Sequence, residues 1–187
     1  MPRTPRSDLD PGLYHLTARA NRRDKLFRAE RDNVMFCDLV AQVSRPETFL
    51  VRGHCLMTTH YHLLVETQTA ELSDAMRDLN GIYAKWFNKE HGFRGHVFEK
   101  RFDAESISSE SHLLEVVRYV ALNPVRAGLV STPARWRWGS FAAVMGGVPA
   151  PSFLDVSWTL RLFSEDDGEA RRQLSSFVSF GSGASAA

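Results

Sequence analysis

Cysteine is scarce in this 187-residue chain, which has only Cys37 and Cys55. Two cysteines are too few for a disulfide framework and lack the paired spacing of a structural zinc site, so a reducing compartment fits the sequence. Long apolar runs are also missing: none could cross a bilayer, and residues 1–6 lack the apolar segment of a signal peptide. We therefore expect a cytoplasmic protein that has no membrane partner.

A strong charge of one sign is absent too, because the formal net charge at pH 7 is only +1. A surface that binds phosphates would have to arise from local clusters of cations. One cluster lies between Val116 and Leu154, where acidic residues are absent, and comprises Arg118, Arg126, Arg135 and Arg137. Another comprises Arg19, Arg22, Arg23, Lys25 and Arg28. Taken alone, each cluster is better interpreted as a solvated face than as a binding site.

Hydrophobic periodicity divides the first two thirds of the chain into strands and helices. Alternating β-branched and aromatic residues predict strands, and apolar residues at helical spacing predict helices. In chain order the expected elements are strand 12–17, helix 28–44, strand 49–57, strand 60–66, helix 73–92, strand 102–107 and helix 108–123. The last helix is expected to end at Asn123, because Pro124 disfavours helical geometry in the residue before it. After Trp138 the pattern is weak, with one candidate helix at 168–180.

This order of elements predicts an α+β fold, a ferredoxin-like split βαβ antiparallel sheet with helices on one face. The length and the 43% apolar composition fit one domain. We expect an N-terminal arm at 1–10, a folded catalytic domain at 11–145 and a C-terminal extension at 146–187. The last residues of the extension, 181–187, have a composition that favours disorder.

His60 and His62 are two residues apart on a predicted strand, so both imidazoles project from one face while Tyr61 points to the other. Such a pair can converge on one metal ion. Without context the pattern is a weak indication, because histidine is also a common half-buried polar residue on sheets. His54 and Cys55 lack the spacing of a zinc site and are interpreted as structural.

Tyr119 and Asn123 are four residues apart on the last predicted helix, which places them about 40° apart around its axis. The apolar stripe of that helix lies on another side, so Tyr119 is not needed as a core residue. The alternative makes Tyr119 a rim residue and Asn123 a cap of the helix terminus. By itself, the spacing favours that alternative.

The two constellations together resemble the IS200-like tyrosine transposases, particularly the branch associated with REP palindromes. The segment Met57–Val65, with His60-Tyr61-His62, is similar to the strand that carries the HUH motif of that family. The segment Arg118–Val130 is similar to its nucleophile helix. Further matching segments follow in the same order within residues 10–145, at 14–19, 83–88, 95–102 and 138–141. One departure is Thr58-Thr59, where many relatives have Pro-Asn.

The resemblance implies an HUH endonuclease fold and a transposase that cleaves and rejoins single-stranded, hairpin-containing DNA through a 5′-phosphotyrosine intermediate. It implies Tyr119 as the nucleophile, and His60, His62 and Asn123 as ligands of one divalent ion. Two imidazoles alone would also accept zinc or iron, whereas an amide oxygen and open positions suit Mg²⁺ or Mn²⁺, which the resemblance favours. Bound to its DNA, the protein would be associated with the nucleoid.

A protein of this kind would hold single-stranded DNA through cations on the backbone and aromatic rings beneath unpaired bases. The candidates for backbone contacts are Arg22, Arg23, Lys85, Arg94, Lys100, Arg101, Arg118 and Arg126. Trp86 and Phe98 are weaker candidates for base contacts, since aromatic residues at helical spacing are more often core residues.

Two other functions fit parts of the sequence. A non-catalytic, domesticated nucleic-acid-binding module of the same fold would keep the basic clusters without cutting DNA, although the intact set of histidines, tyrosine and asparagine argues against it. A two-histidine phosphoesterase is suggested by His15-Leu16-Thr17, but it needs a second H-x-T motif, which the sequence lacks. The choice between monomer and homodimer stays open, and with it whether Tyr119 serves its own histidines or those of a partner.

Overall fold

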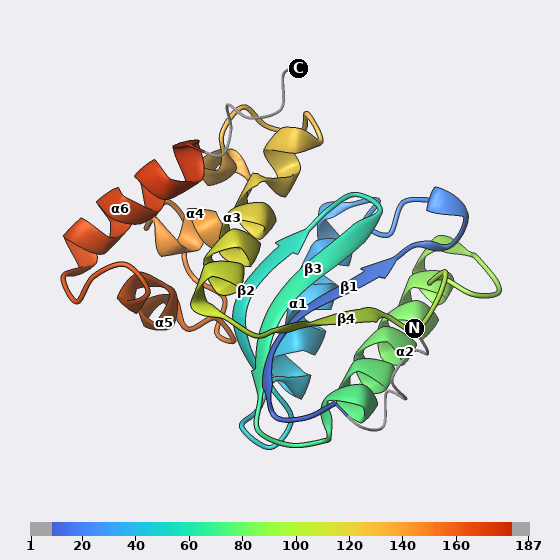
Figure 1. Ribbon diagram of the computed structural model, residues 1–187. Coiled ribbons are helices and arrows are strands. Elements are labelled where there is room, and N and C mark those ends of the chain that lie inside the picture. Colours follow the sequence, from blue (N-terminus) through green and yellow to red (C-terminus); the bar gives the residue numbers. More distant parts are fainter. Residues whose placement is uncertain (1–8, 181–187) are drawn as a thin grey trace.

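The computed structural model describes residues 9–180 of the chain (Figure 1). Within that range, four strands are formed: β1 (Gly12–Arg19), β2 (Leu50–Leu56), β3 (His60–Thr67) and β4 (Asp103–Ile107). The α-helices of the same range are α1 (Glu30–Val43), α2 (Leu72–His91), α3 (Glu110–Arg126), α4 (Ser140–Val144), α5 (Val156–Arg161) and α6 (Asp167–Phe180). No helix among the described residues is long and apolar enough to span a membrane.

The strands form one antiparallel sheet in the order β2-β3-β1-β4. Strands β1 and β3 are therefore central, and the register pairs Thr17 with His62 and Arg19 with His60. This strand order is that of a split βαβ sheet, which confirms the predicted α+β, ferredoxin-like class.

Alternate residues of the central strands form the main core beneath α1 and α2. Leu16 of β1 and Tyr61 and Leu63 of β3 have no exposed surface. The Tyr61 ring packs against Phe36 of α1 with 4.6 Å between centroids, and its hydroxyl donates to Oδ1 of Asn80 in α2 at 2.8 Å. The prediction that Tyr61 points away from the two histidines is therefore confirmed.

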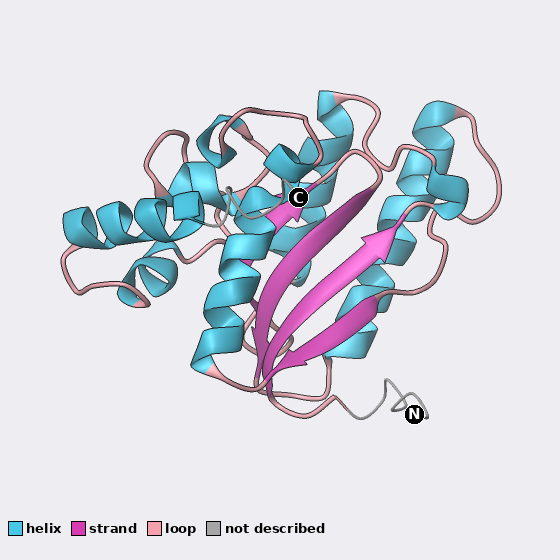
Figure 2. Ribbon diagram, turned by 45° about the horizontal axis from the view of Figure 1, so that its top comes forward, coloured by secondary structure: helices cyan, strands magenta, loops and turns pink. Residues whose placement is uncertain are grey.

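Helix α3 differs from the expectation that helices cover only one face of the sheet. Its residues Val116 and Val120 pack with Leu64 of β3 in a separate buried cluster. Because Leu64 and Leu63 point to opposite faces, α3 lies on the side of the sheet away from α1 and α2 (Figure 2). The apolar stripe of α3 has to be buried, and this face is the one that α1 and α2 leave open.

Helix α3 also runs through Pro124 to Arg126, so the prediction that it ends before the proline was wrong. A proline in the last turn removes a single helical hydrogen bond, and its ring is buried. The helix ends where Gly128 adopts a φ of 68°. The amide of Gly128 then donates to Val125 O and the amide of Leu129 to Pro124 O, both at 2.9 Å, which is a Schellman ending.

The C-terminal extension contains more helix than its sequence pattern indicated. Helix α6 confirms the candidate at 168–180, whereas α4 and α5, with five and six residues, are too short to produce a clear period. Leu160 of α5 and Leu174 of α6 pack with Leu122 of α3 in a second core. The predicted disorder of 181–187 lies outside the described residues, as does most of the predicted arm at 1–10.

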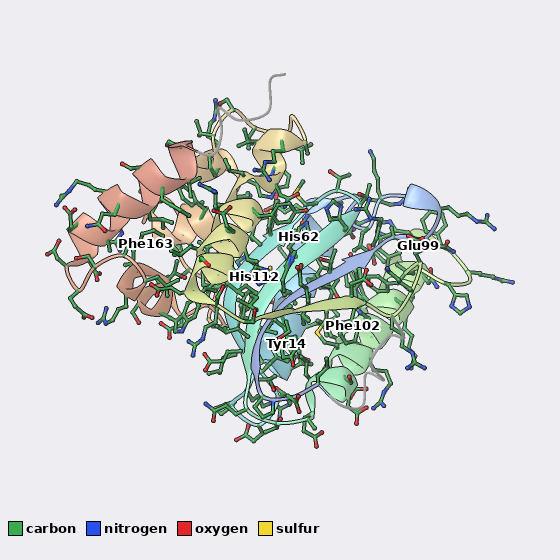
Figure 3. All side chains as sticks on the ribbon, in the orientation of Figure 1. Tyr14, His62, Glu99, Phe102, His112 and Phe163 are labelled. Atoms are coloured by element: carbon green, nitrogen blue, oxygen red, sulfur yellow. The ribbon has the colours of Figure 1, made fainter. Side chains whose placement is uncertain are left out.

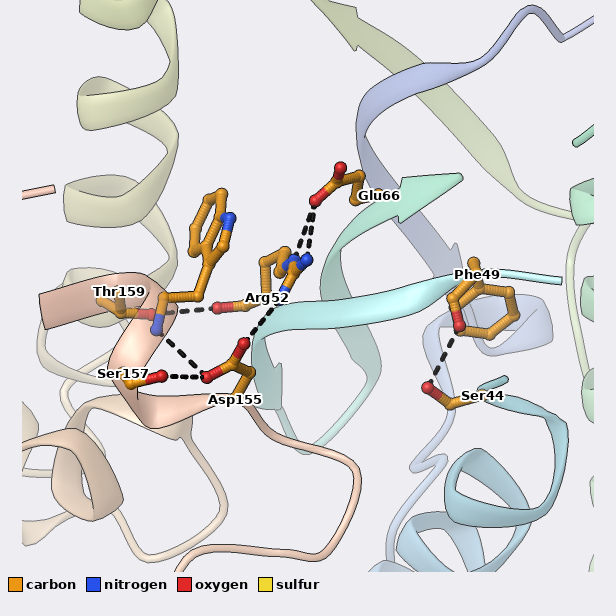
Figure 4. Close-up of polar contacts among 8 residues, drawn as sticks. Ser44, Phe49, Arg52, Glu66, Asp155, Ser157 and Thr159 are labelled. Atoms are coloured by element: carbon orange, nitrogen blue, oxygen red, sulfur yellow. Dashed lines mark hydrogen bonds and ion pairs between the residues drawn. The ribbon is translucent and has the colours of Figure 1, made fainter. Parts of the chain in front are cut away.

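Arg52 of β2 links the extension to the sheet (Figure 4). Its guanidinium donates to Glu66 of β3 at 2.9 Å and to Asp155, at the start of α5, at 2.8 Å. Its backbone carbonyl accepts a hydrogen bond from the Thr159 hydroxyl at 3.2 Å. One arginine therefore holds α5 against the sheet from both its side chain and its backbone.

His54 and Cys55 of β2 are buried, with exposures of 3% and 1%, as expected for structural residues. Burial lowers the pKa of His54 to about 4. Among the described residues, Nδ1 of His54 has no hydrogen-bond partner. The ring is therefore held neutral by the core around it.

The variant His54→Leu should be less sensitive to mild acid than the wild type. In the unfolded chain this histidine takes up a proton at its ordinary pKa of 6.5. Because the folded pKa is lowered, its contribution to stability is complete above that pH and is lost as the pH falls toward 4. Between about pH 7.5 and about pH 5 the loss is about 2 kcal/mol. Urea unfolding at both pH values measures it, and an equal loss in wild type and variant would exclude His54 as the source.

Candidate active site

His60 and His62 lie at the start of β3, on the face of the sheet that α3 partly covers. Their ring centroids are 4.9 Å apart. His62 is only 3% exposed and lies next to α3 (Figure 3), whereas His60 is half-buried. The two imidazoles thus share one face and lie side by side, which is the geometry that a metal-binding pair requires.

Neighbouring side chains occupy Nδ1 of both rings. Oγ1 of Thr59 lies 3.0 Å from Nδ1 of His60. Nε2 of His15 and Oγ1 of Thr17 lie 2.9 and 3.3 Å from Nδ1 of His62. A ring that donates from Nδ1 keeps a free lone pair on Nε2, with which a neutral imidazole can bind a metal. Nε2 of His62 is buried and has no hydrogen-bond partner among the described residues, so it fits a ligand of a cation.

Electrostatics hold both rings in the neutral form. Burial, and then the charge of Arg19, lowers the pKa of His60 to about 4. Burial, and then the neighbouring His15, His60 and Arg19, lowers the pKa of His62. Because a histidine must be neutral to bind a metal, the pair is ready for a cation at neutral pH.

Tyr119 projects from α3 onto the face that carries the two histidines. Its ring lies edge-on to His62 and His15, with centroids 5.4 and 5.7 Å away. The residue is 40% exposed, and within the described part of the chain its hydroxyl has no hydrogen-bond partner. The guanidinium of Arg126 lies 5.7 Å from the centre of the Tyr119 ring. The ring of Tyr119 therefore lies beside His62, His15 and the cation of Arg126.

Asn123 follows Tyr119 by one helical turn. Its Nδ2 donates to the carbonyl of Tyr119 at 3.1 Å. The amide nitrogen is thereby engaged by the helix, and the amide oxygen is the atom that a hard cation prefers. In the described part of the chain Asn123 makes no hydrogen bond to His60 or His62, so its role as a third ligand remains a prediction.

The donor set fits a small divalent cation. Among residues 9–180, no group of three or more histidine, cysteine or acidic side chains is arranged to hold an ion. The set proposed from the sequence contains two imidazoles and one amide oxygen, and therefore does not need such a group. Three protein ligands would leave positions open for water or phosphate oxygens.

His15, Thr17 and Arg19 were not predicted as neighbours of the histidine pair. They alternate along β1, so they share one face, and the register with β3 brings that face to His60 and His62. The H-x-T pattern contained a usable signal, because it has the same two-residue spacing as the histidine pair. Its meaning depends on which strand lies next to β1, and that is a property of the fold.

Several of the predicted DNA-binding cations gather beyond the end of β1, near the start of β3. Backbone hydrogen bonds hold the loop 92–101 against this end of the strand (Figure 1). Arg22 and Arg94 line one open hollow there, of about 470 Å³. Lys100 and Arg101 line a second hollow beside it, which shares several lining residues with the first. All four side chains are exposed, and Lys100 also pairs with Asp103, with 2.6 Å between Nζ and Oδ2.

Of the other four predicted cations, Arg126 lies beside the Tyr119 ring and three lie elsewhere. The Arg118 guanidinium pairs with Glu115 on its own helix and lies 4.7 Å from the ring centre of Phe177. Lys85 is exposed on α2 but lines neither hollow. The side chain of Arg23 lies outside the described part of the structure. These three residues remain predictions without structural support.

Both aromatic candidates for base contacts pack against the core. The rings of Trp86 and Phe98 lie 5.8 and 6.3 Å from the ring of Tyr83, which is fully buried. Phe98 also lines one of the two hollows, together with Lys100. Trp86 lines neither hollow.

Comparisons with known proteins identify the family and the fold. No curated protein matches the chain. A solved structure of a REP-associated tyrosine transposase bound to a REP hairpin is similar over 83% of this chain and 93% of that chain, with 22% sequence identity and a TM-score of 0.64. At that identity the likeness shows a common fold. The profile of the family described as "Transposase IS200 like" matches residues 11–123, which is more than half of the chain. The chain therefore belongs to the IS200-like transposase family.

Proposed function

We propose that this protein cleaves and rejoins single-stranded, hairpin-containing DNA through a covalent bond between Tyr119 and the DNA. The proposal is based on the contact between side chains of α3 and β3. Tyr119 lies 5.4 Å from His62 between ring centroids, and His60 lies beside His62. Side chains from distant parts of the sequence thus lie in contact, which supports the proposal, and membership of the transposase family supplies the class of reaction.

His60, His62 and Asn123 would hold one divalent ion, for which we propose Mg²⁺ or Mn²⁺. When bound, such an ion would withdraw negative charge from the scissile phosphate. The chain's own part is to present two neutral imidazoles, with Nδ1 already engaged by neighbouring groups, and an amide oxygen one turn beyond Tyr119.

The proposed step is a substitution at phosphorus. Oη of Tyr119 forms a bond to the phosphorus while the bond from phosphorus to the 3′ oxygen of the upstream nucleotide breaks. The phenol gives up its proton to solvent, and the departing 3′ oxygen takes up a proton. The products are a 5′-phosphotyrosine and a free 3′-hydroxyl. Because one phosphodiester replaces another, attack by a 3′-hydroxyl at a new junction reverses the step without ATP.

Two features of the site favour this step over a purely structural role for Tyr119. The side chain is 40% exposed, so a phosphate can reach its hydroxyl. Arg126 lies beside the ring and places a positive charge where a phosphate would approach. A core tyrosine such as Tyr83 is buried instead, and its hydroxyl donates to a backbone carbonyl at 2.7 Å.

The similar solved structure is bound to a REP hairpin, and we propose that this chain also binds DNA hairpins. Arg22, Arg94, Lys100 and Arg101 lie beyond the same end of the sheet as His60, so a strand held along them would lead toward the histidine pair. Contacts of this kind position the DNA without reading its sequence.

Tyr119 would serve the histidines of its own chain, because its ring contacts His62 within one chain. A monomer would then be sufficient for cleavage. Mixing Tyr119→Phe with His62→Ala tests this, because restored cleavage in the mixture would require exchange of α3 between two chains.

The function is tested with a fluorescent single-stranded hairpin oligonucleotide and Mn²⁺, followed by a denaturing gel. The proposal predicts a protein–DNA band that survives denaturation and disappears with EDTA. Hairpin binding without any such band would favour the non-catalytic binding module.

The double variant Arg22→Ala/Arg94→Ala should bind the hairpin more weakly and with a flatter dependence on salt. Each phosphate contact to a single strand contributes roughly 0.7 to the slope of log affinity against log salt concentration, so two lost contacts lower the slope by about 1.4. A titration at several salt concentrations measures the change. The matched control is Arg161→Ala/Arg172→Ala, which removes two arginines from α5 and α6. If the control and the test variant show the same slope, the hollow at Arg22 is a solvated surface and not a DNA contact.

A further inference from the structure

His15 on β1 makes the closest polar contact with the histidine pair. It is 9% exposed, and its ring stacks on His62 with 5.1 Å between centroids and 19° between planes. Its Nε2 lies 2.9 Å from Nδ1 of His62. A hydrogen bond at this distance joins the two rings, and one of them must be the donor.

The carboxylate of Glu105 favours one choice of donor. Glu105 is the register partner of His15 on β4, and its carboxylate lies 3.8 Å from Nδ1 of His15. A carboxylate favours a proton on the nitrogen that faces it, because it can only accept. A neutral His15 with its proton on Nδ1 has a bare Nε2, which then accepts from Nδ1 of His62. His62 is left with a bare Nε2, the nitrogen that is buried without a partner among the described residues.

The opposite arrangement is disfavoured. If His15 donated to His62, the proton of His62 would sit on Nε2, where no acceptor is present among the described residues. A buried donor without an acceptor is costly, and a protonated Nε2 cannot bind a cation. The lone pair of His15 would then also face the carboxylate of Glu105. The carboxylate of Glu105 beside His15 and the unpartnered Nε2 of His62 therefore favour the same pair of tautomers.

We propose that His15, backed by Glu105, is a positioning residue that holds His62 in the Nδ1–H tautomer and in the ring orientation that a divalent ion requires. This inference rests on the proposed function only in naming the ion. Metal-bound histidines commonly donate their second ring nitrogen to a carboxylate, a carbonyl or water, and the loss of such a partner weakens metal binding. Here the partner of His62 on β3 is the imidazole of His15 on β1. That imidazole in turn lies beside the carboxylate of Glu105 on β4.

Two alternative roles for this group of side chains are less consistent with the contacts. His112 also lies near Glu105, at 3.6 Å, which suggests a second metal site of two histidines and a carboxylate. Among the described residues these side chains are not arranged to hold an ion. Thr17 is the other candidate for holding His62, but its hydroxyl lies 3.3 Å from Nδ1 of His62, farther than Nε2 of His15 at 2.9 Å.

The tautomer can be observed directly by long-range ¹H–¹⁵N correlation spectra of the imidazoles, without metal or DNA. The chain has seven histidines, so single substitutions assign the signals. The proposal predicts that His62 of the wild type carries its proton on Nδ1, and that His15→Leu moves it toward a mixture of tautomers. A wild-type His62 with its proton on Nε2 would overturn the proposal, whatever the protein does with metal.

The second measurement is Mn²⁺ affinity, by electron paramagnetic resonance titration of the folded protein without DNA. His15→Leu should bind Mn²⁺ roughly 10- to 100-fold more weakly. His15→Gln should recover most of the affinity, because its amide oxygen can accept from Nδ1 of His62. The matched control is His54→Leu, which removes a buried histidine of β2 that has no contact with the site, and which should bind Mn²⁺ as the wild type does.

The outcomes separate this inference from the proposed function. If the wild type binds no Mn²⁺, the metal site of the proposed function fails, and the tautomer spectra still test the positioning role. If the wild type binds and His15→Leu binds equally well, the metal site stands and the positioning role is wrong. If His15→Leu does not fold, His15→Gln provides the test, because a role limited to packing predicts no preferred tautomer at His62 in that variant.

Discussion

Replacing Tyr119 by phenylalanine is expected to remove the covalent protein–DNA adduct completely while leaving stability and hairpin affinity almost unchanged. The hydroxyl of Tyr119 has no hydrogen-bond partner within the described residues, so its loss leaves no buried group unsatisfied. The ring remains and keeps its contacts with His62 and His15. The adduct is measured on a denaturing gel with Mn²⁺, and stability by urea unfolding.

The matched control is Tyr83→Phe, for which the reverse result is expected. The hydroxyl of Tyr83 is buried and donates to the carbonyl of Leu26 at 2.7 Å. Its removal leaves that carbonyl without its partner and should cost about 1–3 kcal/mol of stability, whereas adduct formation persists. An adduct that survives in Tyr119→Phe and is absent from folded Tyr83→Phe would contradict the assignment of the nucleophile.

His60→Ala and His62→Ala should each reduce cleavage by at least about 100-fold, while hairpin affinity changes little. Both imidazoles lie at the proposed ion site, whereas most candidate phosphate contacts lie at Arg22, Arg94 and the loop that ends at Arg101. Cleavage is measured from single-turnover time courses at saturating hairpin and Mn²⁺, and affinity by fluorescence anisotropy in the presence of EDTA.

The variant Arg22→Ala/Arg94→Ala is the natural control for the histidine variants. It should bind the hairpin weakly but form the adduct when the DNA is saturating. Wild-type cleavage rates in either His60→Ala or His62→Ala would remove that histidine from the metal site. A large loss of affinity in EDTA would show instead that the histidines contact DNA directly.

The two faces of β3 were predictable from the sequence because they depend only on the period of a strand. Two residues per repeat place His60 and His62 together and Tyr61 opposite, whatever the rest of the chain does. The same local reasoning placed Tyr119 and Asn123 on one side of a helix. That this side meets the histidines was implied by resemblance to a family and did not follow from spacing.

Features that depend on contacts between distant segments were not predictable. The role of His15 requires β1 to lie next to β3 in one register, since a shift of a single residue would turn His15 to the opposite face. The position of α3 on the second face depends on which surface α1 and α2 leave open. The rule that a helix ends before a proline failed at Pro124. The cost of one missing hydrogen bond in the last turn is outweighed by packing of the helix against the sheet and against α6.

The central claim is that Tyr119 becomes covalently attached to DNA, and mass spectrometry of the wild-type adduct tests it most directly. The protein is incubated with a hairpin oligonucleotide and Mn²⁺, treated with nuclease and digested with a protease. The account predicts a single modified peptide, which contains Tyr119 and carries nucleotide through a 5′ phosphate. Nucleotide attached to Tyr14, Tyr61 or Tyr83, or cleaved DNA with no modified peptide at all, would contradict it.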